Sequence, residues 1–211
     1  MCIITTVVKP KLCYVGVRAA ALASEGISSG RGSGWALLTA EALPPPPITK
    51  SDAAFAAEGL EFVVGHDAVS LAELNDLFER VGFPKRDPGR LAIALANTHC
   101  TMWIRCTRGS RWARMGQLLG FARATSDKAL TATIWDVAIN PAWQKSGLGR
   151  GVVERLTAAL VGDGITTITL FAEPGVVGLY EKLGFVREPS GVQGMAFQRT
   201  SAAGGALMLA R

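Results

Sequence analysis

Residues 131–150 read TATIWDVAINPAWQKSGLGR, and this stretch decides the fold. Its first nine residues are rich in β-branched side chains, which is typical of a strand, and Asn140-Pro141 ends that strand. A helix is expected to follow from Gly149 to about Leu160, because apolar residues recur there at helical spacing. The sequence therefore predicts a strand, a tight glycine-containing turn and a helix in direct succession.

The turn between this strand and this helix has the features of an anion-binding site. It is made of Gln144, Lys145, Ser146, Gly147, Leu148, Gly149 and Arg150. Backbone N–H groups of such a turn converge at the positive end of the helix dipole, where they can hold a phosphate. Gly147 and Gly149 have no Cβ that would keep the phosphate away from these amides. No Gly-Lys-Ser/Thr stands at the helix start, as a Walker A loop requires, and Val152 occupies the third glycine position of the Rossmann fingerprint.

From about Glu61 onward the chain alternates strand and helix patterns. Further strands are predicted at 61–64, 99–105, 118–125, 165–171, 185–186 and 195–197. Further helices are predicted at 71–81 after the capping box Ser70-Glu73, at 88–98 after Asp87-Pro88, and at 174–183. This order indicates an α/β (α+β) domain, in which helices flank both faces of a mixed, mostly antiparallel sheet.

The first fifty residues differ in composition from the rest of the chain. They are rich in Ala, Ser and Thr, contain two acidic residues against five basic ones, and end in the proline run 44–47. This composition is typical of an organelle transit peptide, and the alternative is a disordered tail of a cytosolic protein. We predict a transit peptide with a Pro-rich linker at 1–50 and a single folded domain at 51–211.

Composition also excludes several classes of protein. Outside the leader, 17 basic residues stand against 15 acidic ones, so we expect no nucleic acid partner. The four cysteines and two histidines lack the spacing of a zinc site, and we expect no metal. No apolar stretch reaches the length of about 18 residues that a membrane-spanning helix needs, so we expect no membrane partner.

Two motifs resemble the GNAT superfamily of N-acetyltransferases. The Q-x-x-G-x-G pattern at 144–149, after a strand that ends in Val-x-Ile, resembles the acetyl-CoA motif, and LYEKLGF at 179–185 resembles the second signature. The resemblance covers about residues 60–200. Three further segments resemble the plastid acetyltransferases of plants and algae: 81–88, 121–127 and 132–137. That group includes serotonin N-acetyltransferase and enzymes that acetylate protein lysines and N-termini. The resemblance implies a GNAT fold, acetyl-CoA as co-substrate, and a location in the chloroplast stroma.

The resemblance also implies where acetyl-CoA lies. The pantetheine arm is expected along Val137, Ala138 and Ile139, bonded to their backbone like an added strand. The diphosphate is expected on the turn 144–150. Tyr180 is expected to be the general acid that gives a proton to the departing CoA thiolate, which a phenol with a pKa of about 10 can do.

Two carboxylates are candidates for the base that takes the proton of the amine. Glu173 precedes the predicted helix of Tyr180 and matches an acidic position of the plastid group. Asp136 lies within the cofactor strand, where strand alternation places it on the face opposite Trp135. The alternatives are that Glu173 only favours the helix N-terminus and that Asp136 is a hydrogen-bond acceptor inside the sheet.

The expected acceptor is a small primary amine, serotonin or a related arylalkylamine, for which Trp135, Phe121 and Trp143 offer aromatic surface. The alternatives are a plastid protein acetyltransferase acting on lysines or N-termini and a non-catalytic acyl-CoA-binding regulator. The protein is expected to be a monomer or a homodimer. Four spaced arginines form either a solvated loop or a docking patch for an acidic substrate or a CoA phosphate, and would suit a protein acceptor: Arg105, Arg108, Arg111 and Arg114.

Overall fold

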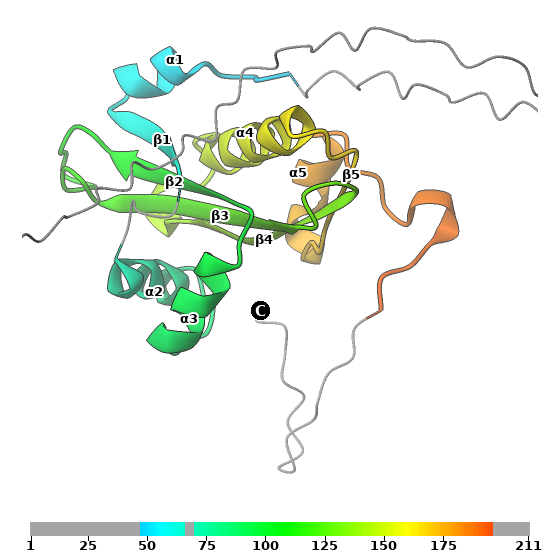
Figure 1. Ribbon diagram of the computed structural model, residues 1–211. Helices are drawn as coiled ribbons and strands as arrows, with labels where there is room; N and C mark the ends of the chain where they lie inside the picture. Colours follow the sequence, from blue (N-terminus) through cyan, green and yellow to red (C-terminus); the bar gives the residue numbers. More distant parts are fainter. Residues whose placement is uncertain (1–46, 66–69, 196–211) are drawn as a thin grey trace, which may run out of the picture. The chain divides into compact units, whose positions relative to one another are not determined.

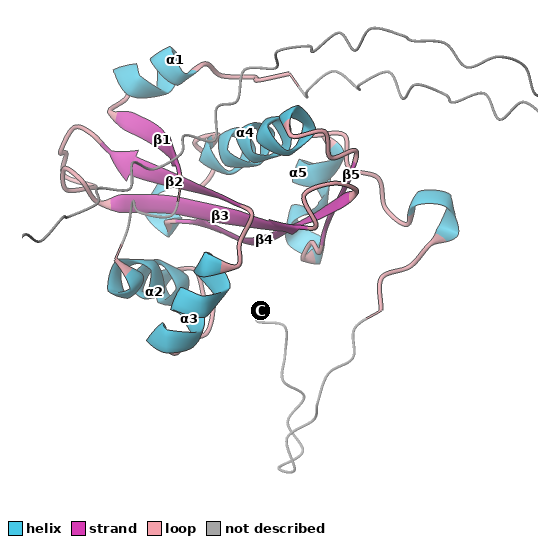
Figure 2. Ribbon diagram, in the orientation of Figure 1, coloured by secondary structure: helices cyan, strands magenta, loops and turns pink. Residues whose placement is uncertain are grey.

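The computed structural model describes residues 47–65 and 70–195 (Figures 1 and 2). Its strands are β1 (Leu60–Val64), β2 (Cys100–Cys106), β3 (Leu118–Ser126), β4 (Thr131–Ile139) and β5 (Thr167–Leu170). Its α-helices are α1 (Asp52–Ala57), α2 (Leu71–Arg80), α3 (Pro88–Ala96), α4 (Leu148–Gly162) and α5 (Val177–Glu181). Short 3₁₀ helices are η1 (Pro141–Trp143), η2 (Pro174–Val176) and η3 (Pro189–Gly191). Almost all of the predicted leader lies outside the described residues.

The strands of the described residues form one sheet in the order β1-β2-β3-β4-β5. The first three pairs are antiparallel, and β4 pairs with β5 in parallel because α4 connects them as a crossover. The predicted fold class is therefore confirmed. None of the helices in the described part of the chain is long and apolar enough to cross a lipid bilayer.

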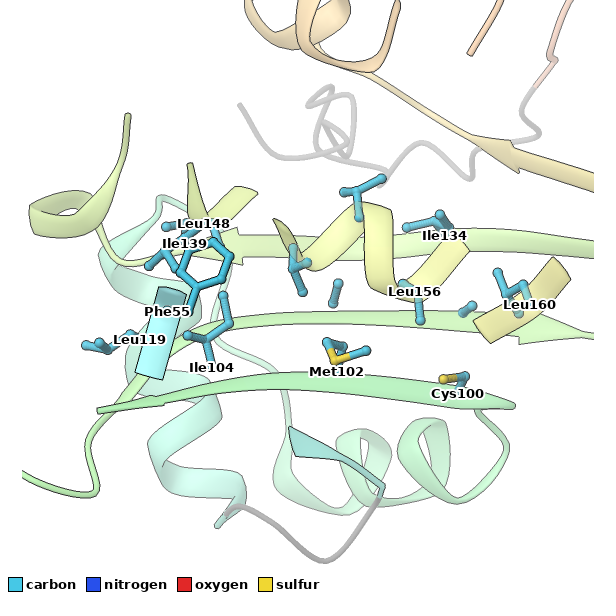
Figure 3. Packing of buried hydrophobic residues seen from close by; sticks show 14 of the residues in the cluster. Phe55, Cys100, Met102, Ile104, Leu119, Ile134, Ile139, Leu148, Leu156 and Leu160 are labelled. Carbon is cyan, nitrogen blue, oxygen red and sulfur yellow. The ribbon is translucent and has the colours of Figure 1, made fainter. Parts of the chain in front are cut away.

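Helices cover the two faces of the sheet with separate apolar cores. On one face, α4 contributes Leu148, Leu156 and Leu160, which pack against side chains of β2, β3 and β4 (Figure 3). On the other face, α2 and α3 cover Trp103 and Phe121 of β2 and β3 (Figure 1). Each layer thus hides the apolar stripe of an amphipathic helix from water.

The helix-start signals act as the sequence predicts, with one difference. The side chain of Asp87 accepts a hydrogen bond from the N–H of Arg90 at 2.8 Å and begins α3. The side chain of Ser70 accepts one from the N–H of Glu73 at 3.1 Å and begins α2. The carboxylate of Glu73, however, binds the guanidinium of Arg105 and so links α2 to the sheet.

Several predicted elements differ in the structure. The helix predicted at 174–183 begins as the 3₁₀ turn η2 and becomes α-helical only at Val177. The short helix α1 was missed. The strand predicted at 185–186 is wrong, because the N–H of Phe185 donates to the carbonyl of Tyr180 and closes α5. Of the strand predicted at 195–197, Met195 is in no strand and the rest lies outside the described residues.

The segment before α1 is fastened to α4. Glu154 of α4 is only 2% exposed, and its carboxylate accepts hydrogen bonds from the N–H and the hydroxyl of Thr49. Arg155 donates to the side chain of Asp52 at 2.7 Å and to the carbonyl of Lys50 at 2.9 Å. A buried carboxylate needs such partners. Thr49 and Lys50, which the sequence places in the leader, therefore contribute to the folded domain.

Candidate active site

Strands β4 and β5 separate halfway along β4. Their pairing ends at Ile134 and Leu170, whereas β4 continues to Ile139. Residues 135–139 of β4 therefore pair with β3 on one side and are no longer paired with β5 on the other. The result is a short open strand edge in the middle of the sheet, next to the helix α4 crossover.

A β-bulge lies where the two strands separate. Arg123 of β3 pairs with Trp135, and Phe121 pairs with Ala138, so that Asp136 and Val137 together face one residue of β3. Asp136 has a φ of +52°, an uncommon value for a residue other than glycine. The prediction that Trp135 and Asp136 lie on opposite faces is wrong: Trp135 lies opposite Arg123, and Asp136 binds the same Arg123.

The open edge offers the peptide groups of two residues. The N–H of Asn140 donates to the carbonyl of Leu119 in β3 at 2.8 Å. Because hydrogen-bonded and non-hydrogen-bonded pairs alternate along an antiparallel ladder, Ala138 also turns its peptide groups toward β3. Val137 and Ile139 turn theirs toward the open edge, and the carbonyl of Ile139 accepts a hydrogen bond from the side chain of Gln144 at 3.3 Å.

The predicted anion-binding turn leads from η1 into α4. Its backbone reverses through two residues in the left-handed region, Lys145 at φ +61° and Gly147 at φ +90°. The hydroxyl of Ser146 donates to the carbonyl of Trp143 at 2.5 Å and holds the turn closed. The indole N–H of Trp143 is buried without an acceptor among the described residues.

The start of α4 presents unpaired amides. The first intrahelical bond runs from the N–H of Gly151 to the carbonyl of Gly147 at 2.9 Å, so the amides of residues 148–150 precede the helical ladder. No side chain among the described residues caps this end. A Cβ placed on Gly147 would meet no atom within 4 Å, so space is open there. These features fit a diphosphate.

Tyr180 lies on the α4 side of the sheet. Its side chain is 8% exposed and packs edge-on against Phe185, with ring centroids 5.9 Å apart. Burial raises the pKa of the Tyr180 phenol above its ordinary value of 10.0. Among the residues that the structure describes, no hydrogen-bond partner occupies its hydroxyl. The phenol is therefore protonated and available as a donor.

The two candidate carboxylates have different surroundings. Asp136 is mostly buried, accepts a hydrogen bond from Arg123 Nε at 2.6 Å and lies 3.8 Å from a guanidinium nitrogen of Arg86. Its carboxylate oxygens thus face two guanidinium groups. Glu173 is exposed, caps η2 without a side-chain hydrogen bond, and lies one short turn before the helix of Tyr180.

The aromatic residues proposed for acceptor binding are spread over three environments. Phe121 is fully buried under α2, and Trp143 packs against the α4 core. Trp135 lies on the same face as Phe121 but beside β5, where its ring is 5.5 Å from that of Phe171. Phe171 is 59% exposed. The sequence does not predict it as a site residue, because an apolar side chain at the end of a strand is typical of a core position as well.

No group of three or more His, Cys, Asp or Glu side chains in the described ranges could hold a metal ion. The described structure instead brings together an open strand edge, a helix start with unpaired amides, and a buried phenol.

Comparison with known proteins relates this arrangement to one family. Residues 68–185 match the acetyltransferase (GNAT) family. GCN5-related N-acetyltransferase 1, chloroplastic, of Arabidopsis thaliana is 39% identical over 74% of this chain and 76% of its own. Serotonin N-acetyltransferase 2, chloroplastic, of Oryza sativa subsp. japonica is 41% identical over 71% and 72%. The crystal structure of a putative acetyltransferase from Deinococcus radiodurans is 28% identical, with a TM-score of 0.54 over 67% of this chain and 89% of that chain.

Proposed function

This chain belongs to the acetyltransferase (GNAT) family and is an N-acetyltransferase, and we propose that it transfers the acetyl group of acetyl-CoA to the primary amine of an arylalkylamine such as serotonin. The open edge of β4 beside the start of α4 is the observation that carries the proposal. Val137 and Ile139 would hold the pantetheine arm through their outward peptide groups, and the amides of residues 148–150 would hold the diphosphate. Acetyl-CoA supplies an activated thioester at the end of that arm.

Tyr180 would act as the general acid. A phenol kept protonated by burial can donate to the sulfur that leaves as the thioester breaks. Its hydroxyl, unpartnered within the described residues, supports this role because no protein acceptor competes for the proton.

Glu173 would accept or relay the proton of the attacking amine. Its exposure and its position just before η2 support this role, since a proton acceptor must exchange its proton with solvent. Asp136 would instead hold the bulge in place through its ion pairs with Arg123 and Arg86.

Trp135 and Phe171 would form the acceptor surface. Both rings lie where β4 and β5 separate, which is also where the outward edge of β4 begins. Aromatic rings at such a spacing favour a planar ring in an offset or edge-on arrangement. The presence of a named serotonin N-acetyltransferase among the relatives supports an indole amine.

A thiol-release assay with acetyl-CoA tests the proposal. Serotonin and tryptamine are expected to be acetylated with a higher kcat/KM than spermidine or a lysine peptide. A preference for the lysine peptide would favour protein acetylation, and negligible release with every amine would favour a non-catalytic acyl-CoA-binding regulator.

We also propose a plastid location, with a transit peptide and linker before the domain. The chloroplastic names of relatives support the location. The contacts of Thr49 and Lys50 with α4 support a start of the folded domain near residue 48, slightly earlier than composition indicates.

A further inference from the structure

A polar pocket lies at the end of the sheet where β4 leads into η1. Its volume is about 820 Å³, within the range of about 300–1,000 Å³ typical of small-molecule sites. The walls come from α2, from the loop 107–117 between β2 and β3, and from Asn140. The pocket is therefore separate from the bulge and from the phenol of Tyr180.

The walls of this pocket are positively charged. Four arginines and two carboxylates line it: Arg80, Arg105, Arg111, Arg114, Glu73 and Asp76. Glu73 accepts two hydrogen bonds from Arg105, at 2.9 and 3.0 Å, and one from the N–H of Leu118 at 2.8 Å. Arg80, Arg111 and Arg114 have no ion-pair partner within the described residues. Guanidinium groups in this situation favour a phosphate or carboxylate.

The loop that supplies two of these arginines is held in one conformation. The N–H of Ser110 donates to the carbonyl of Ala113 at 2.8 Å, and the N–H of Arg114 donates to the side chain of Gln117 at 2.9 Å. Of the four arginines in the predicted patch, only Arg108 turns away, to the carbonyl of Ala57 at 3.0 Å. These bonds shape the loop backbone that carries Arg111 and Arg114 on the wall of the pocket.

Asn140 adds a polar side chain to the wall of the pocket. Its side chain is only 6% exposed, lines the pocket, and accepts a hydrogen bond from the N–H of Ala142 at 3.1 Å. Its Nδ2 has no hydrogen-bond partner among the described residues. This amide reaches the open space of the pocket and can donate a hydrogen bond to a ligand there.

An aromatic ring stands at the same pocket. Trp112 is 62% exposed, and the guanidinium of Arg111 lies 4.7 Å from its ring centre. A tryptophan face that is open to solvent can stack against a planar base. Net positive charge, an amide donor and an open indole together match a phosphate attached to an aromatic base.

We propose that this pocket binds a nucleoside monophosphate group, with Arg111 and Arg114 on the phosphate and Trp112 on the base. The group has two sources, the 3′-phosphoadenosine end of acetyl-CoA or a free nucleotide. A free nucleotide bound here would be linked to the cofactor turn through Asn140, because this residue lines the pocket and caps η1. The first source rests on the proposed use of acetyl-CoA, whereas the second does not.

The experiment compares the variant Arg111→Gln/Arg114→Gln with Arg108→Gln in the full chain. Arg108 is the matched control because it lies in the same loop but outside the pocket. If the source is the cofactor, the double variant weakens acetyl-CoA binding at least tenfold and leaves binding of 3′-dephospho-acetyl-CoA unchanged. If the source is free, adenosine 3′,5′-bisphosphate binds the wild type saturated with acetyl-CoA, and the double variant loses that binding.

Unchanged acetyl-CoA affinity together with no bisphosphate binding would overturn the proposal. So would a variant whose only defect is a higher KM for acidic peptide acceptors, because that result would make the pocket a protein-docking surface. Turnover of tryptamine by the wild type is measured in parallel. A wild type that binds the bisphosphate but acetylates no amine would refute the proposed reaction and leave the nucleotide site standing.

Discussion

A substitution at Gly147 tests whether the turn before α4 binds the diphosphate of acetyl-CoA. Its effect on cofactor affinity can be separated from its effect on protein stability. The substitution Gly147→Ala adds one Cβ, which would meet no atom within 4 Å, so the free protein gains no clash. It does force alanine into a φ of +90°, at a cost of about 1–2 kcal/mol. For a domain of this size, that strain lowers the melting temperature by about 2–8 °C.

The same methyl group would occupy the open space in front of the amides of residues 148–150. Keeping the diphosphate from one charge-assisted hydrogen bond costs about 1.5–3 kcal/mol, which corresponds to roughly a 10- to 150-fold weaker Kd for acetyl-CoA. Isothermal titration calorimetry measures the Kd, and differential scanning calorimetry measures the melting temperature.

Gly164 provides a matched control at the other end of α4. Its φ is +86°, and a Cβ there would also meet no atom within 4 Å. Gly164→Ala is therefore expected to lower the melting temperature by a similar amount and to leave the Kd for acetyl-CoA unchanged. Equal effects of the two substitutions on the Kd would refute the assignment of this turn to the diphosphate.

Three further predictions concern the phenol, the acceptor surface and the start of the domain. Tyr180→Phe is expected to lower kcat about 10²- to 10⁴-fold with little change in acetyl-CoA affinity, and unchanged kcat would exclude the acid role. Because burial raises the pKa of the phenol above 10.0, the midpoint of any loss of wild-type kcat through its deprotonation should lie above that pH. Phe171→Ala is expected to raise KM for tryptamine about fivefold or more and leave KM for a small aliphatic amine unchanged, with Val186→Ala, an exposed apolar side chain after α5, as the control. A chain that starts at residue 51 should melt at least 5 °C below one that starts at residue 48, because the buried carboxylate of Glu154 loses its hydrogen bonds from Thr49. Equal melting temperatures would show that this contact adds no stability.

The sequence by itself predicts most of the helices and strands because their signals are local. Apolar spacing and the caps Ser70 and Asp87 fix α2 and α3, and β-branched residues fix β4 with its observed bounds. The glycine turn before α4 is also local, since the left-handed backbone at Gly147 is a property of that residue type. The resemblance to the acetyltransferase family is visible in this turn and in the Tyr180 segment, both of which are continuous in sequence.

Only the tertiary structure decides which surfaces these elements share. The bulge at Asp136 depends on the register between β3 and β4, so alternation within one strand places this side chain on the wrong face. The gathering of Arg80, Arg111 and Arg114 around Asn140 joins three elements that are far apart in the chain. Likewise, Thr49 belongs to the domain because a carboxylate 105 residues later is buried against it. Such relations come from packing between distant segments, and no local pattern of side chains encodes them.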